Sequence, residues 1–123
     1  MIQRAAAVIV RDGNVLLMHR LKEGREYYSF PGGSVEDGET PEQAVVREIR
    51  EEFTLDIIPE KLLLEMETMG NYGYYYLVKR YTGTPKLGGE EKRIMTPQNQ
   101  YHPVWKPLAE LRGLENLYPE DVR

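Results

Sequence analysis

Three glutamates in one short segment are the residues best suited to do chemistry. Glu48, Glu51 and Glu52 lie at positions i, i+3 and i+4, which places them in one narrow sector of a helix. Like charges at this spacing destabilise a helix by roughly 0.2–0.5 kcal/mol per pair, so a sequence without a functional demand would tend to place lysines among them. Carboxylate oxygens are the ligands that Mg²⁺ prefers, and bound Mg²⁺ keeps waters for phosphate substrates. The spacing therefore favours a divalent-cation site over a solvated acidic face.

The helix that must position these carboxylates has a well-marked beginning. Thr40 is suited to the N-cap, Pro41 fits the first helical position, and Gln43 completes a capping box. An apolar stripe about a third of a turn from the carboxylates is expected to pack against a core. This stripe consists of Val45, Val46, Ile49 and Phe53.

The glycine pair before this helix and the phasing of the charged residues resemble a known motif. The segment Gly33 to Leu55 is similar to the Nudix box, Gly-x5-Glu-x7-Arg-Glu-U-x-Glu-Glu-x-Gly-U, in which U is a bulky aliphatic residue. The matching positions are Gly33, Glu39, Arg47, Glu48, Ile49, Glu51, Glu52 and Leu55. One defined position departs from the motif, because Thr54 stands where the family has glycine.

Resemblance to the Nudix hydrolase family implies an α/β fold, a mixed β-sheet sandwiched between helices, with residues 1–123 forming a single domain. It also implies hydrolysis of a nucleoside diphosphate linked to another moiety, with Mg²⁺ as cofactor and Mn²⁺ as a substitute. The substrate would be a nucleoside triphosphate, oxidised or not, a dinucleotide or a nucleotide sugar. Two alternatives remain open: a catalytically silent nucleotide-binding or regulatory module, and a phosphatase or isomerase on the same scaffold.

The same resemblance assigns roles to individual residues. The catalytic set would be Glu48, Glu51 and Glu52 with Arg47 and Glu39, and the three helix glutamates would serve mainly as metal ligands. Which of them acts as the base stays undecided. The carbonyl of Gly32 is expected to be a metal ligand, and the pairing of Glu39 with Arg47 is expected to orient the loop against the helix. One further acidic ligand, Glu90 or Glu91, is expected from the long segment Gly83 to Gln100.

Two residues outside the box are candidates for substrate contact. Arg20 follows an apolar strand at the expected edge of the site, although a solvated arginine is the simpler reading. Tyr72 lies at the distance past the box where some family members carry a tyrosine that accompanies dinucleoside polyphosphate hydrolysis. Tyrosines in strands are more often cross-strand packing residues, so the Tyr72 match carries little weight.

The remaining sequence predicts further strands and turns. Residues Ala5 to Val10 and Val15 to Met18 are apolar runs joined at Asp12-Gly13, which predicts antiparallel neighbours buried on both faces. The other expected elements are a strand at Tyr27–Phe30, a turn at Asp56–Pro59, strands at Leu62–Met69, Tyr74–Tyr81 and Val104–Trp105, a short helix at Pro107–Leu111, and a helical start at Pro119.

Composition narrows the class of protein. The 123 residues include no cysteine, which excludes a disulfide framework and a cysteine-based zinc site. There is no apolar run of 18 residues and no signal peptide pattern, so we expect no membrane partner and a cytoplasmic protein. The net charge of −4 gives no support for binding a nucleic-acid polymer. A monomer or homodimer that acts on a small-molecule nucleotide is expected.

The departure at Thr54 leads to a conformational prediction. A left-handed residue commonly closes a helix at this position, and glycine adopts that conformation without cost. A β-branched residue there carries strain of about 1–3 kcal/mol. We therefore expect Thr54 to avoid the left-handed region and the helix to end by another turn, with Leu55 still pointing inward.

Overall fold

The computed structural model describes residues 2–68, 70–86, 88, 95–113 and 117–118. The elements in chain order are β1 (Ile2–Arg11), β2 (Asn14–Lys22), β3 (Arg25–Ser29), β4 (Gly32–Ser34), α1 (Pro41–Phe53), β5 (Asp56–Thr68), β6 (Asn71–Thr82), β7 (Asn99–Pro107), the 3-10 helix η1 (Leu108–Gly113) and β8 (Leu117–Tyr118).

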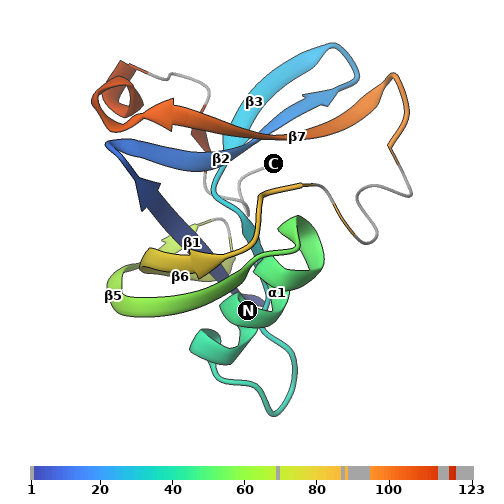
Figure 1. Ribbon diagram of the computed structural model, residues 1–123. Helices are drawn as coiled ribbons and strands as arrows, with labels where there is room; N and C mark the ends of the chain where they lie inside the picture. Colours follow the sequence, from blue (N-terminus) through green and yellow to red (C-terminus); the bar gives the residue numbers. More distant parts are fainter. Residues whose placement is uncertain (1, 69, 87, 89–94, 114–116, 119–123) are drawn as a thin grey trace.

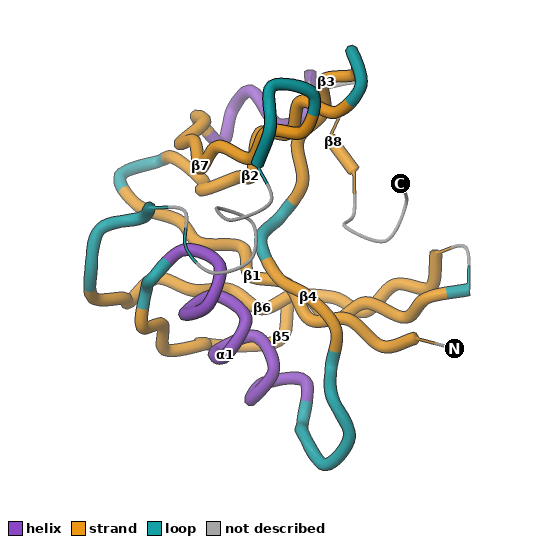
Figure 2. Tube along the Cα trace, turned by 90° about the vertical axis from the view of Figure 1, so that its right-hand side faces the viewer, coloured by secondary structure: helices purple, strands orange, loops and turns teal. Residues whose placement is uncertain are grey.

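Strand β1 connects two groups of strands (Figure 1). On one side it pairs in parallel with β6 and antiparallel with β4, and β6 pairs antiparallel with β5. On the other side β1 meets β2 at a hairpin, and β2 pairs antiparallel with both β3 and β7. Figure 2 shows α1 alongside the β1, β5 and β6 group, at a distance from β2, β3 and β7. The predicted α/β fold with a mixed β-sheet is confirmed. Within the described residues, α1 is the only α-helix.

The core lies between α1 and the strands that it covers. Val45, Ile49 and Phe53 of the predicted apolar stripe have no exposed surface, and Val46 is half-buried against the same cluster. The apolar run of β2 is buried as expected, with Val15 to Met18 at most 3% exposed, whereas in the β1 run Val8 and Val10 are only half-buried. Burial of these side chains fixes which side of α1 faces the sheet, and hence where its carboxylates lie.

Both ends of α1 have defined caps. At the N-terminus the Thr40 hydroxyl accepts a hydrogen bond from the Gln43 N–H at 3.1 Å, and the Gln43 side chain accepts one from the Thr40 N–H at 3.0 Å. This is the predicted capping box. At the C-terminus the Thr54 N–H donates to the Arg50 carbonyl at 3.0 Å.

The expectation that Thr54 avoids the left-handed region is wrong. Thr54 has φ 59° and ψ 31°, which is left-handed backbone. The physical reason is that this reversal lets the Thr54 N–H cap the helix while Leu55 enters the core with no exposed surface. Burial of one leucine stabilises the fold by about 1.5–3 kcal/mol, a gain as large as the strain. The expectation that Leu55 points inward is confirmed.

The predicted boundaries of the later elements need correction. The turn expected at Asp56–Pro59 is absent, because β5 begins at Asp56 directly after the reversal at Thr54. Pro59 is accommodated at a register shift of this edge strand, where a missing N–H costs little. The last long strand, β7, spans Asn99–Pro107 rather than two residues, because it pairs with β2 over nine positions.

Other expectations hold with changed bounds. Asp12-Gly13 forms the hairpin turn, although only Val10 and Arg11 of β1 pair with β2 before the strands diverge. The short helix is the 3-10 helix η1, and the helical start at Pro119 lies outside the described residues.

Within the described residues, no helix is long and apolar enough to span a membrane. The cytoplasmic location stays a prediction.

Candidate functional site

The pairing of Arg47 with Glu39 joins the loop before α1 to the helix. The Arg47 Nε donates to Glu39 Oε2 at 2.6 Å, and its Nη2 donates to Glu39 Oε1 at 3.0 Å. The Glu36 N–H also donates to Glu39 Oε1 at 3.0 Å. These donors, Arg47 first and then the Glu36 backbone, lower the pKa of Glu39 to about 2. The geometry is the two-point guanidinium–carboxylate contact that the sequence predicts.

The same guanidinium contacts the carboxylates of the helix. Its Nη1 donates to Glu48 Oε1 at 2.8 Å and to Glu51 Oε1 at 3.2 Å. Its Nη2 also donates to the Ser34 carbonyl at 3.0 Å, which adds a contact with β4. The hydrogen bond with Glu39, followed by those with Glu48, raises the pKa of Arg47 above its ordinary range. Arg47 is therefore charged and serves as the common partner of three carboxylates.

The glycine pair of β4 allows Glu48 and the backbone of β1 to approach closely. A Cβ atom at Gly33 would overlap the Glu48 carboxylate, and one at Gly32 would overlap the backbone of Ala5 and Ala6. Any side chain at Gly33 would thus displace Glu48, whereas any side chain at Gly32 would separate β4 from β1. The structure explains both glycines by space rather than by a turn.

The β4–β1 register determines where the Gly32 carbonyl points. Ala7 donates to the Pro31 carbonyl and Val35 donates to the Gln3 carbonyl, both at 2.8 Å. Because bonded and non-bonded pairs alternate along antiparallel strands, the Gly32–Ala6 pair is a non-bonded one. The carbonyl of Gly32 therefore faces away from β1, an orientation that leaves it suited to a ligand.

The three helix carboxylates lie at different depths. Glu52 is buried at 6% exposure, while the side chains of Glu48 and Glu51 are 20% and 61% exposed. Within the described part of the chain, no three His, Cys, Asp or Glu side chains converge as a metal-binding group. The donors are nevertheless all oxygens, and Mg²⁺ is usually held by one or two carboxylates together with waters and substrate phosphates. The donor set fits a hard divalent cation in type without forming a closed cage.

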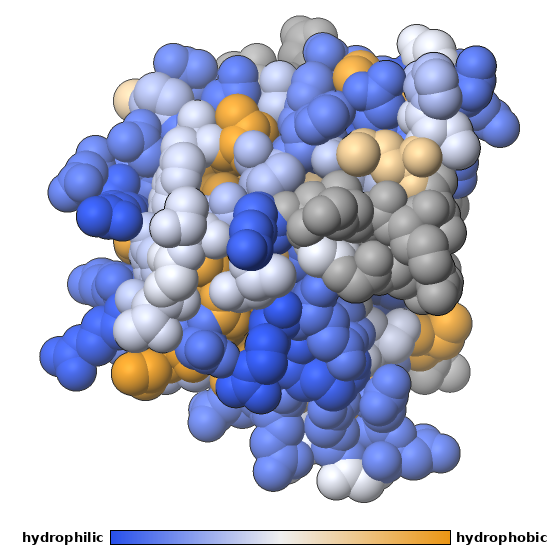
Figure 3. Space-filling model, turned by 45° about the vertical axis from the view of Figure 1, so that its right-hand side comes forward, coloured by the Kyte–Doolittle hydropathy of each residue, from blue (hydrophilic) through white to orange (hydrophobic). Residues whose placement is uncertain are grey.

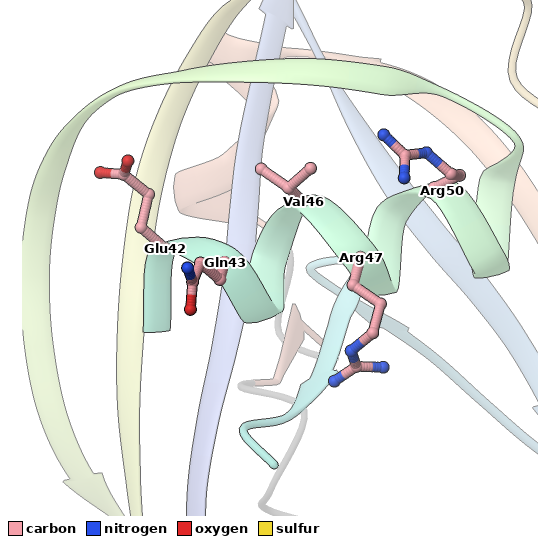
Figure 4. Close-up of a pocket in the computed structure, with 5 residues that line it drawn as sticks. All are labelled: Glu42, Gln43, Val46, Arg47 and Arg50. Carbon is pink, nitrogen blue, oxygen red and sulfur yellow. The ribbon is translucent and has the colours of Figure 1, made fainter. Parts of the chain in front are cut away.

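A shallow pocket lies on another side of α1. Figure 4 shows Glu42, Val46 and Arg50 pointing to one side of the helix, with Arg47 extending to the other. The pocket lining includes none of the three helix carboxylates. In Figure 3 the lower part of the displayed face, where Figure 1 places α1 and the preceding loop, is mostly hydrophilic.

Arg20 is buried rather than solvated. It is 7% exposed, and its guanidinium lies 3.6 Å from the centroid of the Tyr101 ring and 5.8 Å from that of Tyr27. Its Nη2 donates to Asn99 Oδ1 at 2.7 Å, but its buried Nε has no hydrogen-bond partner within the described residues. Sequence reasoning missed Asn99 and Tyr101, because both reach Arg20 only through the β2–β7 pairing.

The structure describes Tyr72 but not the two loop glutamates. The Tyr72 hydroxyl donates to Glu65 Oε1 at 2.7 Å across β5 and β6, which raises the pKa of Tyr72, and its ring lies edge-on to Tyr74. This is the packing role that the sequence made the simpler reading, and a substrate role for Tyr72 stays a prediction. Glu90 and Glu91 lie outside the described residues.

A comparison with protein families decides the membership. The family model described as the NUDIX domain matches residues 1–122. The chain belongs to the Nudix family. This match confirms the predicted resemblance. At the level of the family, it also confirms the prediction of a hydrolase that acts on pyrophosphate bonds.

Curated relatives are similar to about two thirds of the chain. An 8-oxo-dGTP diphosphatase of Haemophilus influenzae is 38% identical over 92 residues, which cover 68% of this chain and 67% of the relative. An RNA pyrophosphohydrolase of Aeromonas hydrophila is 47% identical over 86 residues, covering 68% of this chain and 46% of the relative. The chain thus spans just under half of one relative's length and about two thirds of the other's.

Solved structures are similar over nearly the whole chain. The solution structure of the Escherichia coli ORF135 protein superposes with a TM-score of 0.77 at 29% identity, covering 99% of this chain and 84% of that one. The crystal structure of a MutT NUDIX hydrolase from Burkholderia pseudomallei gives a TM-score of 0.73 at 27% identity, covering 89% and 85%.

Proposed function

We propose that this single Nudix domain is a divalent-metal-dependent pyrophosphohydrolase of small nucleotides. The observation that carries the proposal is the arrangement around Arg47. Its guanidinium donates two hydrogen bonds to Glu39 and one each to Glu48 and Glu51. The glycines of the neighbouring strand β4 leave room for the Glu48 side chain. An acidic helix face that is merely solvated would need neither the two glycines of β4 nor an arginine shared among its carboxylates.

Within this proposal, Glu48, Glu51 and Glu52 hold Mg²⁺ or Mn²⁺ together with the Gly32 carbonyl. The bound cation would neutralise phosphate oxygens and lower the pKa of a coordinated water. Arg47 and Glu39 orient the carboxylates and the β4 loop relative to each other. A water molecule attacks one phosphorus of the pyrophosphate, and one of the three glutamates accepts its proton. The phosphoanhydride bond to that phosphorus breaks, and the other phosphate leaves.

Arg20 is our candidate for substrate recognition. An anionic group of a nucleotide would bind this guanidinium through the 7% of the residue that is exposed, because the Nε atom itself is buried. The half-buried Tyr101 ring lies over the guanidinium, whereas Tyr27 is 3% exposed and serves as a packing partner. Glu90 or Glu91 is retained as the proposed further acidic ligand.

The alternative is a silent Nudix module that binds nucleotides without turnover. Loss of the carboxylates would be its mark, but Glu39, Glu48, Glu51 and Glu52 are all present, and Arg47 bonds to three of them. We therefore favour the enzyme.

The decisive experiment is a turnover panel with Mg²⁺ that detects phosphate and pyrophosphate separately. The panel contains dGTP, 8-oxo-dGTP, a nucleotide sugar, a dinucleoside polyphosphate and an RNA with a 5′-triphosphate. We expect release of pyrophosphate or a mononucleotide from a small nucleotide, and no preference for RNA. Turnover of none of the compounds, with nucleotide binding retained, would support the silent module instead.

A further inference from the structure

The carboxyl end of α1 is held by a segment that follows β6, far along the chain. The Lys86 N–H donates to the Phe53 carbonyl at 3.1 Å, and the Gly88 N–H donates to the Glu52 carbonyl at 2.9 Å. The last four carbonyls of a helix have no partner within it, so these two bonds satisfy groups that would otherwise depend on water. The Gly88 bond falls on a residue whose side chain is one of the site carboxylates.

A side chain at Gly88 would be crowded by the end of α1. A Cβ atom there would lie 3.0 Å from Thr54 Cγ2 and 3.1 Å from the Glu51 carbonyl oxygen. Both distances are shorter than ordinary van der Waals contact, and the Glu51 oxygen belongs to the helix backbone. The absence of a side chain at Gly88 therefore allows the close approach to the end of α1.

Gly88 therefore complements the one departure from the family motif. Thr54 occupies the place of the motif glycine, and its methyl group faces the position where Gly88 lacks a side chain. A larger residue at 88 would shift the Gly88 backbone away from the helix end and weaken the bond to the Glu52 carbonyl. The last turn, which carries Glu51 and Glu52, would then lose one of its fixed partners.

We propose that Gly88 is a positioning residue of the carboxylate site, which it stabilises through its bond to the Glu52 carbonyl and its close packing against Thr54. The proposal rests on the proposed function, because it concerns the cation site formed by the same helix.

Gly88→Ala tests the proposal, since alanine keeps the N–H donor and adds only the Cβ. Mn²⁺ affinity is measured by electron paramagnetic resonance, alongside kcat, KM and the melting temperature of the metal-free protein. We expect Mn²⁺ binding to weaken about tenfold, the lower end of what a metal site loses when a residue that supports its ligands is removed. We expect kcat to fall more than KM rises.

Gly73→Ala is the matched control. A Cβ at Gly73 would lie 3.5 Å from the Tyr75 hydroxyl and 3.6 Å from the Met66 carbonyl, which is ordinary contact, and Gly73 has no positive φ. This variant should bind Mn²⁺ as the wild type does. An equal loss of affinity in both variants would overturn the proposal, because it would show a general effect of glycine replacement.

A rescue variant separates the steric cause from general destabilisation. Thr54→Ser removes the Cγ2 atom that the new Cβ would meet, so in the Gly88→Ala background it should recover Mn²⁺ affinity by about threefold or more. No recovery would show that the contact with Thr54 is not responsible. A lowered melting temperature with unchanged Mn²⁺ affinity would make Gly88 a structural residue only.

Amide hydrogen exchange of the metal-free wild type provides a test that is independent of activity. The Gly88 amide should exchange slowly because it is bonded to the Glu52 carbonyl, and free exchange would overturn the proposal. Failure of the proposed function would look different: the wild type itself would bind no Mn²⁺, while the Gly88 amide would remain protected.

Discussion

Arg47 shows why this position requires an arginine rather than another positively charged side chain. Its guanidinium reaches Glu39, Glu48, Glu51 and the Ser34 carbonyl with three different nitrogens. A lysine ammonium is one point charge and cannot reproduce a two-point contact with Glu39 while reaching the helix carboxylates. The lone arginine among acidic residues is thus explained by geometry as well as by charge.

Glu39 should contribute a pH-dependent part of the stability. Its pKa is about 2 in the folded protein against an ordinary value of 4.5, so between these values the unfolded state binds more protons. The contribution is complete above pH 4.5 and is lost as the pH falls towards 2. Urea unfolding of Glu39→Gln at pH 3 to 6 should therefore show a smaller rise of the unfolding free energy with pH. Parallel curves for variant and wild type would contradict this.

Glu52 and Glu42 form a matched pair of substitutions on one helix. Glu52→Gln keeps the size of the side chain but removes the charge that a hard cation needs. Turnover should fall about 100-fold or more, since loss of a residue that only supports a metal ligand already costs about 10–100-fold. Glu42→Gln, at the first turn and exposed, should stay within about threefold. Circular dichroism should show both variants folded. Equal losses in kcat would mean that the chemistry lies on another face.

At the scale of elements, the end of α1 stores strain. Thr54→Gly should raise the free energy of unfolding by about 1 kcal/mol, because relief of about 1–3 kcal/mol exceeds the added unfolded-state entropy of about 0.4–1 kcal/mol. Thr54→Ala keeps a Cβ in the left-handed region and should gain less. Chemical denaturation measures both variants. If alanine stabilised as much as glycine, left-handed strain would not be the cause.

Element boundaries were predictable only where the signal is local. The capping residues and apolar stripe of α1 predicted the helix, because Thr40, Pro41 and Gln43 act within one turn of each other. The length of β7 was not predictable, because its nine pairs are with β2, about eighty residues earlier in the chain. The turn expected at Asp56–Pro59 failed because the reversal occurs at Thr54, where the sequence carries a residue that disfavours it.

The candidate site divides in the same way. Arg47, Glu39 and the helix glutamates lie within one motif, so their relative placement followed from spacing and resemblance. The burial of Arg20 under Tyr101 and the docking of Gly88 on α1 depend on tertiary contacts that no local pattern encodes.

For the whole molecule, the cation should act as a stabiliser. Binding to the native state alone contributes RT ln(1 + [L]/Kd), about 2.7 kcal/mol at a hundredfold excess over Kd. For a domain of this size the melting temperature should rise by roughly 10 °C at that excess. Scanning calorimetry of EDTA-treated protein, with and without millimolar Mg²⁺, measures the rise. An unchanged melting temperature would count against a cation site among these carboxylates.

The central position of β1 also sets a schedule for folding during synthesis. Strand β1 pairs with β6 from Ile2 with Asn71 to Ile9 with Val78, so it cannot complete that parallel ladder until the β6 segment has emerged. At about 5–20 residues per second, an apolar β1 waits several seconds with only its hairpin partner and β4 available. We expect β1 to need shielding from solvent while the chain is being synthesised. The protein released from the ribosome should refold slowly, because its central contacts join distant parts of the chain.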